Sequence, residues 1–363
     1  MRLAILANAD IGLYKFRREL MERLCAGHEV YIVLPEGEFI EDLKAIGCKY
    51  IQFEFDRRGM NPFADLKQIK RYQSLLQELK PDVVLTYTIK PNIYGGIACR
   101  KAKIPFIANV TGLGTTIENG GALAKVSTTL YKIGLRDAAC VFFQNTNNQE
   151  LFIKEDLVKG RTRVIPGSGV NLQTHCYEKY PSDSDGFHFL FVGRIMKDKG
   201  IEELLQAIRL LHKEDPKITL DIVGWSDEDY NEALETAQAE GAIKLHGLQK
   251  DVHPFYAACH CAVLPSYHEG TANVMLEASS TGRPVITTRV PGCQETFDEG
   301  ITGFGCEVKD VDSLFNAMKK MISLPREKRE DMGKAARSKM EREYDRSIVL
   351  SAYEEEIDRA VAR

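Results

Sequence analysis

The sequence lacks any long run of apolar residues. No stretch approaches the roughly 20 apolar residues that a membrane-spanning helix needs. The run from Met1 to Asn8 has one basic residue and is too short for the apolar core of a signal peptide. An excess of positive charge is also absent, because the 363 residues carry a net charge of -4, which gives no general attraction to nucleic acid. We therefore expect a cytoplasmic protein that touches at most the cytoplasmic face of the inner membrane.

Paired cysteines and complete metal-ligand sets are missing as well. The nine cysteines are odd in number and scattered, mostly within apolar runs, which is typical of buried thiols in a reducing compartment. Cys259-His260-Cys261 resembles part of a zinc site, but no second pair of ligands accompanies it and alternate residues of a strand point to opposite faces. We expect no metal. A dehydrogenase is disfavoured because the glycine-rich segments at Gly112 and Gly167 lack the third glycine of the dinucleotide fingerprint.

Short apolar runs alternate with longer helical patterns along the whole chain. This alternation predicts parallel sheets built from βαβ units, and the length predicts two α/β domains, each doubly wound and Rossmann-like. The predicted strands are Leu3 to Ala7, Glu29 to Leu34, Tyr50 to Phe53, Val83 to Thr86, Phe106 to Val110, Cys140 to Phe143, His188 to Val192, Thr219 to Val223, Ile243 to His246, Cys261 to Leu264 and Val285 to Thr287.

The polar stretch from Tyr180 to Gly186 is the best linker candidate. We place a first domain at 1–175, a second at 187–340, and a C-terminal helix at 341–363 that crosses back to the first domain. Open α/β sheets bind ligands at the carboxyl ends of their strands, so we expect the functional residues in a crevice between the domains.

The most informative segment runs from Val263 to Val285. A strand ends at Pro265, a polar loop carries His268, Glu269 and Gly270, and a helix starts near Ala272 with Glu277 in its second turn. A helix start favours an anion such as a diphosphate, and Gly270 lets that anion approach the backbone. Glu269 would then face a sugar and Glu277 a ribose, because carboxylates accept from hydroxyl pairs. The alternative is a solvated loop with an acid in a first turn.

A basic cluster follows the first predicted strand of the second domain. Gly193 precedes Arg194, which offers a bidentate fork, and Lys199 adds a point charge, so both cations can neutralise a pyrophosphate leaving group. By itself such a cluster is usually solvated surface.

In the first domain, Asp10 could orient an acceptor hydroxyl, with Gly12 allowing a tight turn before the helix. The alternative is that Asp10 caps that helix. The segments Ala122 to Arg136 and Lys67 to Arg71 combine apolar and basic residues. They could rest on anionic lipid, or they could simply have core-facing stripes with solvated charges.

These motifs together resemble glycosyltransferase family 4. The resemblance rests on Gly193 to Gly200, on the Glu269 and Glu277 pair, on Gly282-Arg-Pro-Val and on Pro291-Gly-Cys-Gln-Glu. The segments Asn8-Ala-Asp-Ile, Phe16-Arg-Arg-Glu-Leu, Thr88 to Gly95 and Asn109 to Gly114 are similar to the bacterial branch that extends polyprenyl-diphosphate-linked or capsular saccharides.

The resemblance implies a retaining enzyme of GT-B architecture that uses a UDP-sugar. Arg194 and Lys199 would hold the diphosphate, Glu269 the transferred sugar and Glu277 the ribose. It also implies further donor-binding residues, with His246 and Gly247 near the base: Gly12, Gly193, His246, Gly247, Gly270, Thr271, Ala272, Asn273 and Val274.

The first domain departs from the family pattern. Family members often carry histidines where this chain has Thr86-Tyr-Thr-Ile-Lys and Val110-Thr-Gly-Leu-Gly. Lys90 or the backbone of residues 112–115 could replace them, and Lys90 joins Glu269, Arg194, Lys199 and Asp10 as a catalytic candidate. The predicted acceptor-binding residues are Asn8, Lys90, Asn92, Thr111, Gly112, Leu113 and Gly114.

The sequence thus predicts transfer of a hexose or N-acetylhexosamine to a saccharide acceptor linked to polyprenyl diphosphate, in cell-surface glycan biosynthesis, with no cofactor or metal. A nucleotide-sugar epimerase and a non-catalytic sugar-nucleotide sensor are the alternatives. Incubation with donor alone would expose an epimerase, whereas a sensor would bind donor without turning it over.

Overall fold

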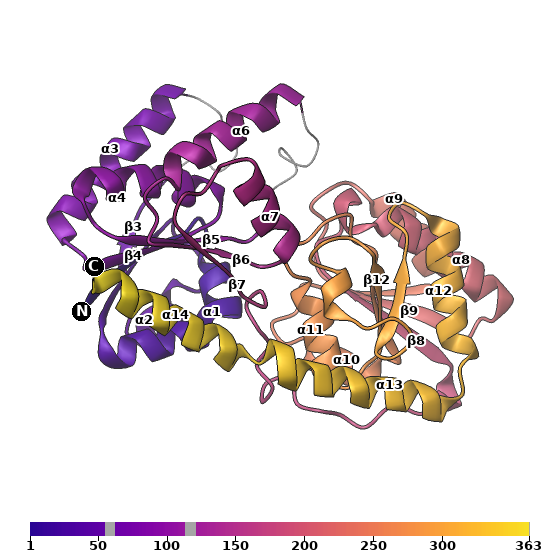
Figure 1. Cartoon of the computed structure of the whole chain (residues 1–363). Helices are drawn as coiled ribbons and strands as arrows, with labels where there is room; N and C mark the ends of the chain where they lie inside the picture. Colours follow the sequence, from indigo (N-terminus) through magenta and orange to yellow (C-terminus); the bar gives the residue numbers. More distant parts are fainter. Residues whose placement is uncertain (55–61, 113–120, 363) are drawn as a thin grey trace. The chain divides into compact units, whose positions relative to one another are not determined.

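The computed structural model describes residues 1–54, 62–112 and 121–362, without the side chains of 62, 63 and 121–124. It forms two compact units (Figure 1). The first comprises Met1–Ser168 and Ser347–Arg363, and the second Gly169–Arg346. Residues 169–186 therefore belong to the second unit, and the prediction that the stretch at Tyr180 is a linker is wrong. Tyr180 is buried and its hydroxyl donates to the His260 carbonyl at 2.9 Å, while Asp183 pairs with Arg329.

The first unit is built on a seven-stranded parallel sheet in the order β3-β2-β1-β4-β5-β6-β7. Its strands are β1 (Arg2–Leu6), β2 (Glu29–Leu34), β3 (Lys49–Gln52), β4 (Val83–Tyr87), β5 (Phe106–Val110), β6 (Cys140–Phe143) and β7 (Arg161–Val164). The central strands β4, β5 and β6 are buried along their whole length, as expected for a parallel sheet covered on both faces. The strand order reverses between β1 and β4, which is the ligand-binding point of a Rossmann-like sheet.

Helices cover both faces of this sheet and enclose a core on each. The elements are α1 (Asp10–Gly27), α2 (Ile40–Ile46), α3 (Pro62–Leu79), the π-helical turn η1 (Pro91–Gly95), α4 (Gly96–Ala102), α6 (Gly121–Gly134), α7 (Thr146–Lys154) and α14 (Arg346–Val361). One core contains Leu13 and Leu20 of α1 with Tyr353 and Ile357 of α14. The other contains Tyr72 of α3 and lies on the opposite face.

The last helix, α14, is an integral part of the first unit (Figure 1). The side-chain amide of Asn109 in β5 donates to the Tyr353 hydroxyl at 2.6 Å. Arg161 of β7 donates to Glu356 at 2.8 Å, and the Glu356 side chain is only 1% exposed. One face of the first unit's sheet is therefore covered in part by a helix from the far end of the sequence.

The second unit has a six-stranded parallel sheet in the order β10-β9-β8-β11-β12-β13. Its strands are β8 (Phe187–Val192), β9 (Ile218–Val223), β10 (Ile243–Gly247), β11 (Cys261–Leu264), β12 (Val285–Thr288) and β13 (Gly303–Cys306). Its helices and helical turns are η2 (Asp183–Asp185), η3 (Lys197–Lys199), α8 (Ile201–Glu214), α9 (Asn231–Ala239), α10 (His253–Ala258), α11 (Asn273–Ser280), η4 (Gln294–Thr296), α12 (Val311–Ser323), α13 (Arg326–Lys339) and η5 (Met340–Tyr344). Each unit thus has the doubly wound α/β architecture that the sequence predicts.

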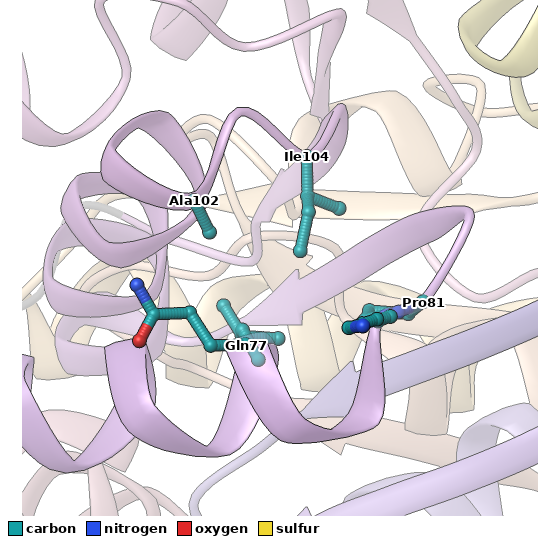
Figure 2. Close-up of a pocket in the computed structure, with 6 residues that line it drawn as sticks. Gln77, Pro81, Ala102 and Ile104 are labelled. Atoms are coloured by element: carbon teal, nitrogen blue, oxygen red, sulfur yellow. The ribbon is translucent and has the colours of Figure 1, made fainter.

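A hollow of about 320 Å³ lies in the first unit, between the end of α3 and the turn from α4 into β5. Figure 2 shows Gln77, Pro81, Ala102 and Ile104 around it. Pro81 and Ile104 precede β4 and β5, so the hollow is at the amino ends of these strands. Because open α/β sheets bind substrates at the carboxyl ends, this hollow is not the expected substrate site.

Candidate functional site

The loop that carries Glu269 is held against the turn that carries Lys199. It connects β11 to α11 in the second unit. The Ser266 hydroxyl donates to the Asp198 carbonyl at 3.1 Å, and the Tyr267 amide donates to the same carbonyl at 2.9 Å. These bonds join the loop to η3, so two motifs about 70 residues apart in the sequence come together.

Two glycines make this close approach possible. Gly200 has a φ of +71°, and a Cβ there would meet the Pro265 carbonyl oxygen at 2.1 Å. Gly292 has a φ of +84°, and a Cβ there would meet the Glu269 carbonyl oxygen at 2.3 Å. Both the left-handed backbone and the lack of space require glycine. Neither glycine is among the predicted site residues, although both lie inside motifs that carry the family resemblance.

Lys199 and Glu269 form an ion pair in which both side chains are largely shielded from water. The Lys199 ammonium donates to Glu269 Oε1, and the side chains are 18% and 17% exposed. A partly buried pair is screened less than a surface pair, so the attraction between these two charges is stronger than it would be on the open surface. The pair places one cation and one acceptor next to the start of α11.

Arg194 lies in a more open position and points to another carboxylate. Its guanidinium donates to Asp227 at 2.8 Å, with the Arg194 side chain 45% exposed. The Asp227 amide donates to the Ile195 carbonyl, and the Gly193 amide donates to the Val223 carbonyl, so this loop is tied to the end of β9. Sequence reasoning missed Asp227, which belongs to no motif.

Glu277 lies in the second turn of α11 and is held by a tyrosine. The Tyr256 hydroxyl of α10 donates to Glu277 Oε2 at 2.9 Å. The other oxygen, Oε1, is 4.0 Å from His175 Nε2, and the Glu277 side chain is 15% exposed. Burial and the neighbouring Glu277 carboxylate raise the pKa of the Tyr256 hydroxyl well above its ordinary value, so Tyr256 stays a donor to Glu277.

The start of α11 is suited to an anion. Ala272 precedes the helix and has no side chain that could cap it, and Val274 follows the first helical residue, Asn273. Among the described residues, Asn273 Oδ1 is buried without a hydrogen-bond partner. Thr271 is 8% exposed, and its carbonyl accepts from the Asn273 backbone amide at 2.9 Å. The positive end of the helix dipole thus adjoins Gly270 and the Lys199–Glu269 pair.

The loops after β9 and β10 complete this end of the sheet. His246 Nε2 is 2.6 Å from Asp221 Oδ1, and its ring packs edge-on against Phe255, which gives His246 a structural partner. The Gly247 carbonyl accepts from the Gly224 amide at 2.9 Å. Trp225 and Leu248 follow β9 and β10 and are 42% and 60% exposed. Leu248 directly follows His246 and Gly247 in the loop predicted to lie near the base, whereas Trp225 was not predicted.

The first loop of the first unit differs from the prediction. Helix α1 begins at Asp10, directly after Asn8 and Ala9, so Gly12 lies in its first turn. Gly12 does not have a positive φ and lies inside the helix, so the prediction of a tight turn at Gly12 is wrong, while its donor-binding role stays a prediction. The Asp10 carboxylate accepts from the Ile11 amide at 2.8 Å and the Phe39 amide at 2.6 Å, which agrees with a structural role.

The other first-unit residues follow β4 and β5. Lys90 Nζ is 3.6 Å from Asp65 Oδ1, with the Lys90 side chain 15% exposed. Asn92 is fully buried; it accepts from the Thr86 hydroxyl at 2.7 Å and donates to the Asn109 carbonyl at 2.8 Å. The prediction that Asn92 contacts an acceptor is therefore wrong, and its role is structural.

The remaining part of the predicted acceptor set follows β5. Thr111 and Gly112 come directly after this strand and are partly exposed. Leu113 and Gly114 lie outside the described residues.

The Cys259-His260-Cys261 segment does not form a metal site. Both cysteines are buried, and His260 accepts from the His188 amide at 3.1 Å while its other nitrogen is 3.2 Å from the Ser182 carbonyl. Burial lowers the pKa of His260 to about 4, so this ring is neutral at physiological pH. In the described part of the chain, a different cluster has metal-ligand types close together: Cys176, Glu178 and His253.

Two family models match most of the chain. The model described as "Glycosyl transferase 4-like" matches residues 2–145, and "Glycosyl transferases group 1" matches residues 176–339. The chain belongs to the GT-B glycosyltransferases. The resemblance drawn from the residue motifs is thereby confirmed, and glycosyl transfer is favoured over the epimerase alternative.

Two relatives of this glycosyltransferase have names that specify lipid-linked sugars. N,N'-diacetylbacillosaminyl-diphospho-undecaprenol alpha-1,3-N-acetylgalactosaminyltransferase of Campylobacter jejuni is 26% identical over 99% of both chains. UDP-Gal:alpha-D-GlcNAc-diphosphoundecaprenol alpha-1,3-galactosyltransferase of Escherichia coli is 27% identical over 72% of this chain and 71% of its own. The crystal structure of Anabaena HepE with UDP and glucose has a TM-score of 0.80 at 20% identity, over 99% of both chains, and shares the fold.

Proposed function

We propose that this glycosyltransferase moves a hexose or N-acetylhexosamine from a UDP-sugar to a saccharide linked to polyprenyl diphosphate, at the cytoplasmic face of the inner membrane. The observation that carries the proposal is the arrangement of Lys199, Glu269 and Glu277 around the start of α11, which no side chain caps. A cation, a helix N-terminus and two hydroxyl-binding carboxylates are what a sugar-nucleoside diphosphate requires. The names of the two relatives support the lipid-linked acceptor.

In this proposal the diphosphate lies at the start of α11. Lys199 is held beside this helix start by Glu269, and Arg194 lies on the neighbouring loop. As the bond to the sugar breaks, negative charge builds on the diphosphate, and preorganised cations and amides stabilise it. Arg194 would exchange Asp227 for the diphosphate, which costs little because the present pair is exposed to water.

Retention of configuration is also part of the proposal. Glu269 is engaged by Lys199 and is assigned to the hydroxyls of the transferred sugar, so it does not serve as a covalent nucleophile. The acceptor oxygen then bonds to the anomeric carbon on the face from which the diphosphate leaves, and its proton passes to the departing diphosphate oxygen. A UDP-α-sugar would give an α-linked product.

The decisive experiment is a panel of UDP- and GDP-sugars with polyprenyl-diphosphate-linked monosaccharides as acceptors, read out by mass spectrometry. We expect a product heavier by one hexose or N-acetylhexosamine, lost in Glu269→Ala and Glu277→Ala and kept in Glu235→Ala, a change on the exposed face of α9. The single tryptophan, Trp225, follows β9 in the same unit, so its fluorescence reports UDP binding in each variant.

Each other outcome contradicts a different part of the proposal. Binding of UDP without transfer to any acceptor would indicate the sensor alternative, and a change of the donor alone would indicate an epimerase. Wild-type fluorescence that does not respond to UDP, with no product, would remove the donor-site assignment.

We further propose that the transfer step needs no metal ion, because Lys199, Arg194 and the start of α11 can neutralise the diphosphate. Turnover of wild-type protein treated with EDTA is expected to stay within about twofold of the untreated rate, measured at saturating donor. Loss of turnover that added Mg²⁺ or Mn²⁺ restores would contradict this, because a bound metal would then supply the charge stabilisation.

The last part of the proposal is contact with the membrane through α6 and α3 of the first unit. Val126 and Ile133 of α6 are 46% and 42% exposed, and Leu66 of α3 is 49% exposed. Exposed basic residues accompany these apolar side chains: Lys67, Lys70, Arg71, Lys125, Lys132 and Arg136. Apolar and basic residues on one surface favour an anionic bilayer. Among the described helices, none is long and apolar enough to cross a membrane.

Vesicle sedimentation tests this contact. Protein carrying Val126→Asp and Ile133→Asp is expected to bind phosphatidylglycerol vesicles about tenfold more weakly than wild type, because each change removes apolar area and adds negative charge. Ile153→Asp is the matched control, since Ile153 of α7 is 54% exposed in the same unit. Equal weakening by the control, or none by the double variant, would contradict the proposed surface.

A further inference from the structure

Three side chains of metal-binding type meet at one point in the second unit. Cys176 and Glu178 lie in the extended segment that precedes β8, and His253 is the first residue of α10. Glu178 Oε1 is 3.2 Å from His253 Nε2 and 3.5 Å from Cys176 Sγ, and Cys176 Sγ is 3.8 Å from His253 Nε2. The same three atoms take part in all three distances, so they form a single triangle.

The size of this triangle matches the edges of a zinc tetrahedron. With the usual Zn–S, Zn–N and Zn–O lengths and tetrahedral angles, the sulfur lies about 3.5 Å from both the nitrogen and the oxygen, and these two lie about 3.3 Å apart. The observed edges of 3.8, 3.5 and 3.2 Å differ from these values by about 0.3 Å or less. A metal could therefore enter without a rearrangement of the three side chains.

The backbone around these ligands is fixed by other parts of the second unit. The Glu178 amide donates to the Thr281 carbonyl at 3.1 Å, and the Glu178 carbonyl accepts from Arg283 at 3.0 Å. The residue before Cys176, His175, accepts from the Ser280 hydroxyl at 2.6 Å through its carbonyl. Ligands held in this way lose little conformational freedom when a metal binds.

We propose that Cys176, Glu178 and His253 bind a Zn²⁺ ion, with water in the fourth position. A thiolate, an imidazole and a carboxylate suit zinc, whereas Mg²⁺ and Ca²⁺ require oxygen ligands. The site is distinct from the diphosphate-binding residues, and the inference does not depend on the proposed donor or acceptor. The ion joins the segment that enters the second unit to α10, the helix whose Tyr256 holds Glu277.

This site has a stabilising role. His253 is 75 residues from Glu178 and 77 residues from Cys176 in the sequence, so the three ligands come together only in the folded second unit. An ion that binds only the folded form raises its stability by mass action. At a free Zn²⁺ concentration a hundredfold above Kd, we expect the Tm of the second unit to rise by about 5 to 11 °C.

Metal titration of the full-length protein tests the proposal. Chelator-treated, reduced protein is titrated with Zn²⁺ against a chromophoric chelator, and with Co²⁺ in an absorption experiment. We expect one Zn²⁺ per chain and a Co²⁺–thiolate charge-transfer band. Cys176→Ser and His253→Ala should each weaken Zn²⁺ binding at least about tenfold and abolish the Tm rise.

Cys25→Ser is the matched control, because Cys25 is a partly exposed thiol in the first unit. It should keep the stoichiometry, the Co²⁺ band and the Tm rise, and circular dichroism confirms that each variant is folded. Zn²⁺ binding that is equal in wild type and both site variants, lost in Cys25→Ser, or absent from wild type would overturn the site. None of these measurements depends on glycosyl transfer.

Discussion

Lys199→Ala is expected to lower kcat for glycosyl transfer by about 10² to 10³, the effect of removing one preorganised charge from a developing anion. Lys199 is the cation beside the start of α11, and its side chain is 18% exposed. The variant also leaves the Glu269 carboxylate without the partner that neutralises it, so the site becomes more repulsive to a diphosphate. We expect weaker UDP binding together with the slower transfer, measured by Trp225 fluorescence and by initial rates.

Lys197→Ala is the control for this change. Lys197 lies in the same helical turn, with its side chain 58% exposed, and its ammonium is 3.4 Å from Glu202. Removing it changes the net charge by the same amount without touching the Glu269 loop, so kcat should stay within about twofold, as for surface pairs. If both variants lose activity equally, the effect comes from net charge. If Lys199→Ala keeps its kcat, Lys199 has no role at the leaving group.

Arg283→Ala is expected to destabilise the second unit by about 4 kcal/mol, because it leaves several buried carbonyl groups unsatisfied. Arg283 is fully buried, and burial lowers the pKa of its guanidinium. Its five hydrogen bonds all go to main-chain oxygens, namely those of Tyr256, Ala257, Glu178, Lys179 and Gly282. The Tm of the second unit should fall by about 8 to 16 °C.

Arg289→Ala separates this effect from the loss of any arginine. Arg289 pairs with Glu299 and Glu307 and its side chain is 43% exposed, so its removal should cost less than about 1 kcal/mol. Arg283→Lys should destabilise nearly as much as Arg283→Ala, because a lysine cannot supply the planar fork of donors. A melting temperature of Arg283→Ala within 2 °C of wild type, measured by calorimetry, would contradict this account.

The sheets could be predicted from the sequence because most strands are uninterrupted apolar runs. Every predicted strand is present, and four have the predicted bounds: Glu29–Leu34, Phe106–Val110, Cys140–Phe143 and Cys261–Leu264. Two of the four edge strands, β7 and β13, were missed. Strand β7 contains Arg161 and Arg163, and β13 contains two glycines, so neither has the hydrophobic pattern of a buried strand.

The candidate site could be predicted only as far as its motifs extend. The positions of three site residues could be predicted from sequence spacing, because each lies near the end of a predicted strand or the start of a predicted helix: Glu269, Glu277 and Lys199. Asp227 could not be found in this way, because its pairing with Arg194 depends on how the loop after β9 folds. Asn92 was predicted to contact the acceptor because it lies in the Thr88 to Gly95 segment that resembles the family, whereas its side chain bonds to Thr86 and Asn109 inside the unit. The Cys176, Glu178 and His253 cluster has no sequence spacing that would reveal it.

The place of α14 in the first unit sets the order in which a nascent chain can fold. The second unit is continuous and is complete once Arg346 has been synthesised, whereas the first unit also needs Ser347–Arg363. At about 5 to 20 residues per second, the ribosome spends roughly ten to forty seconds on the second unit while the first lacks its last helix. During that time the face that Tyr353 and Ile357 later cover remains apolar and open. The half of the enzyme that is made first is therefore finished last, and a premature stop before α14 would release a protein whose second unit is intact and whose first is not.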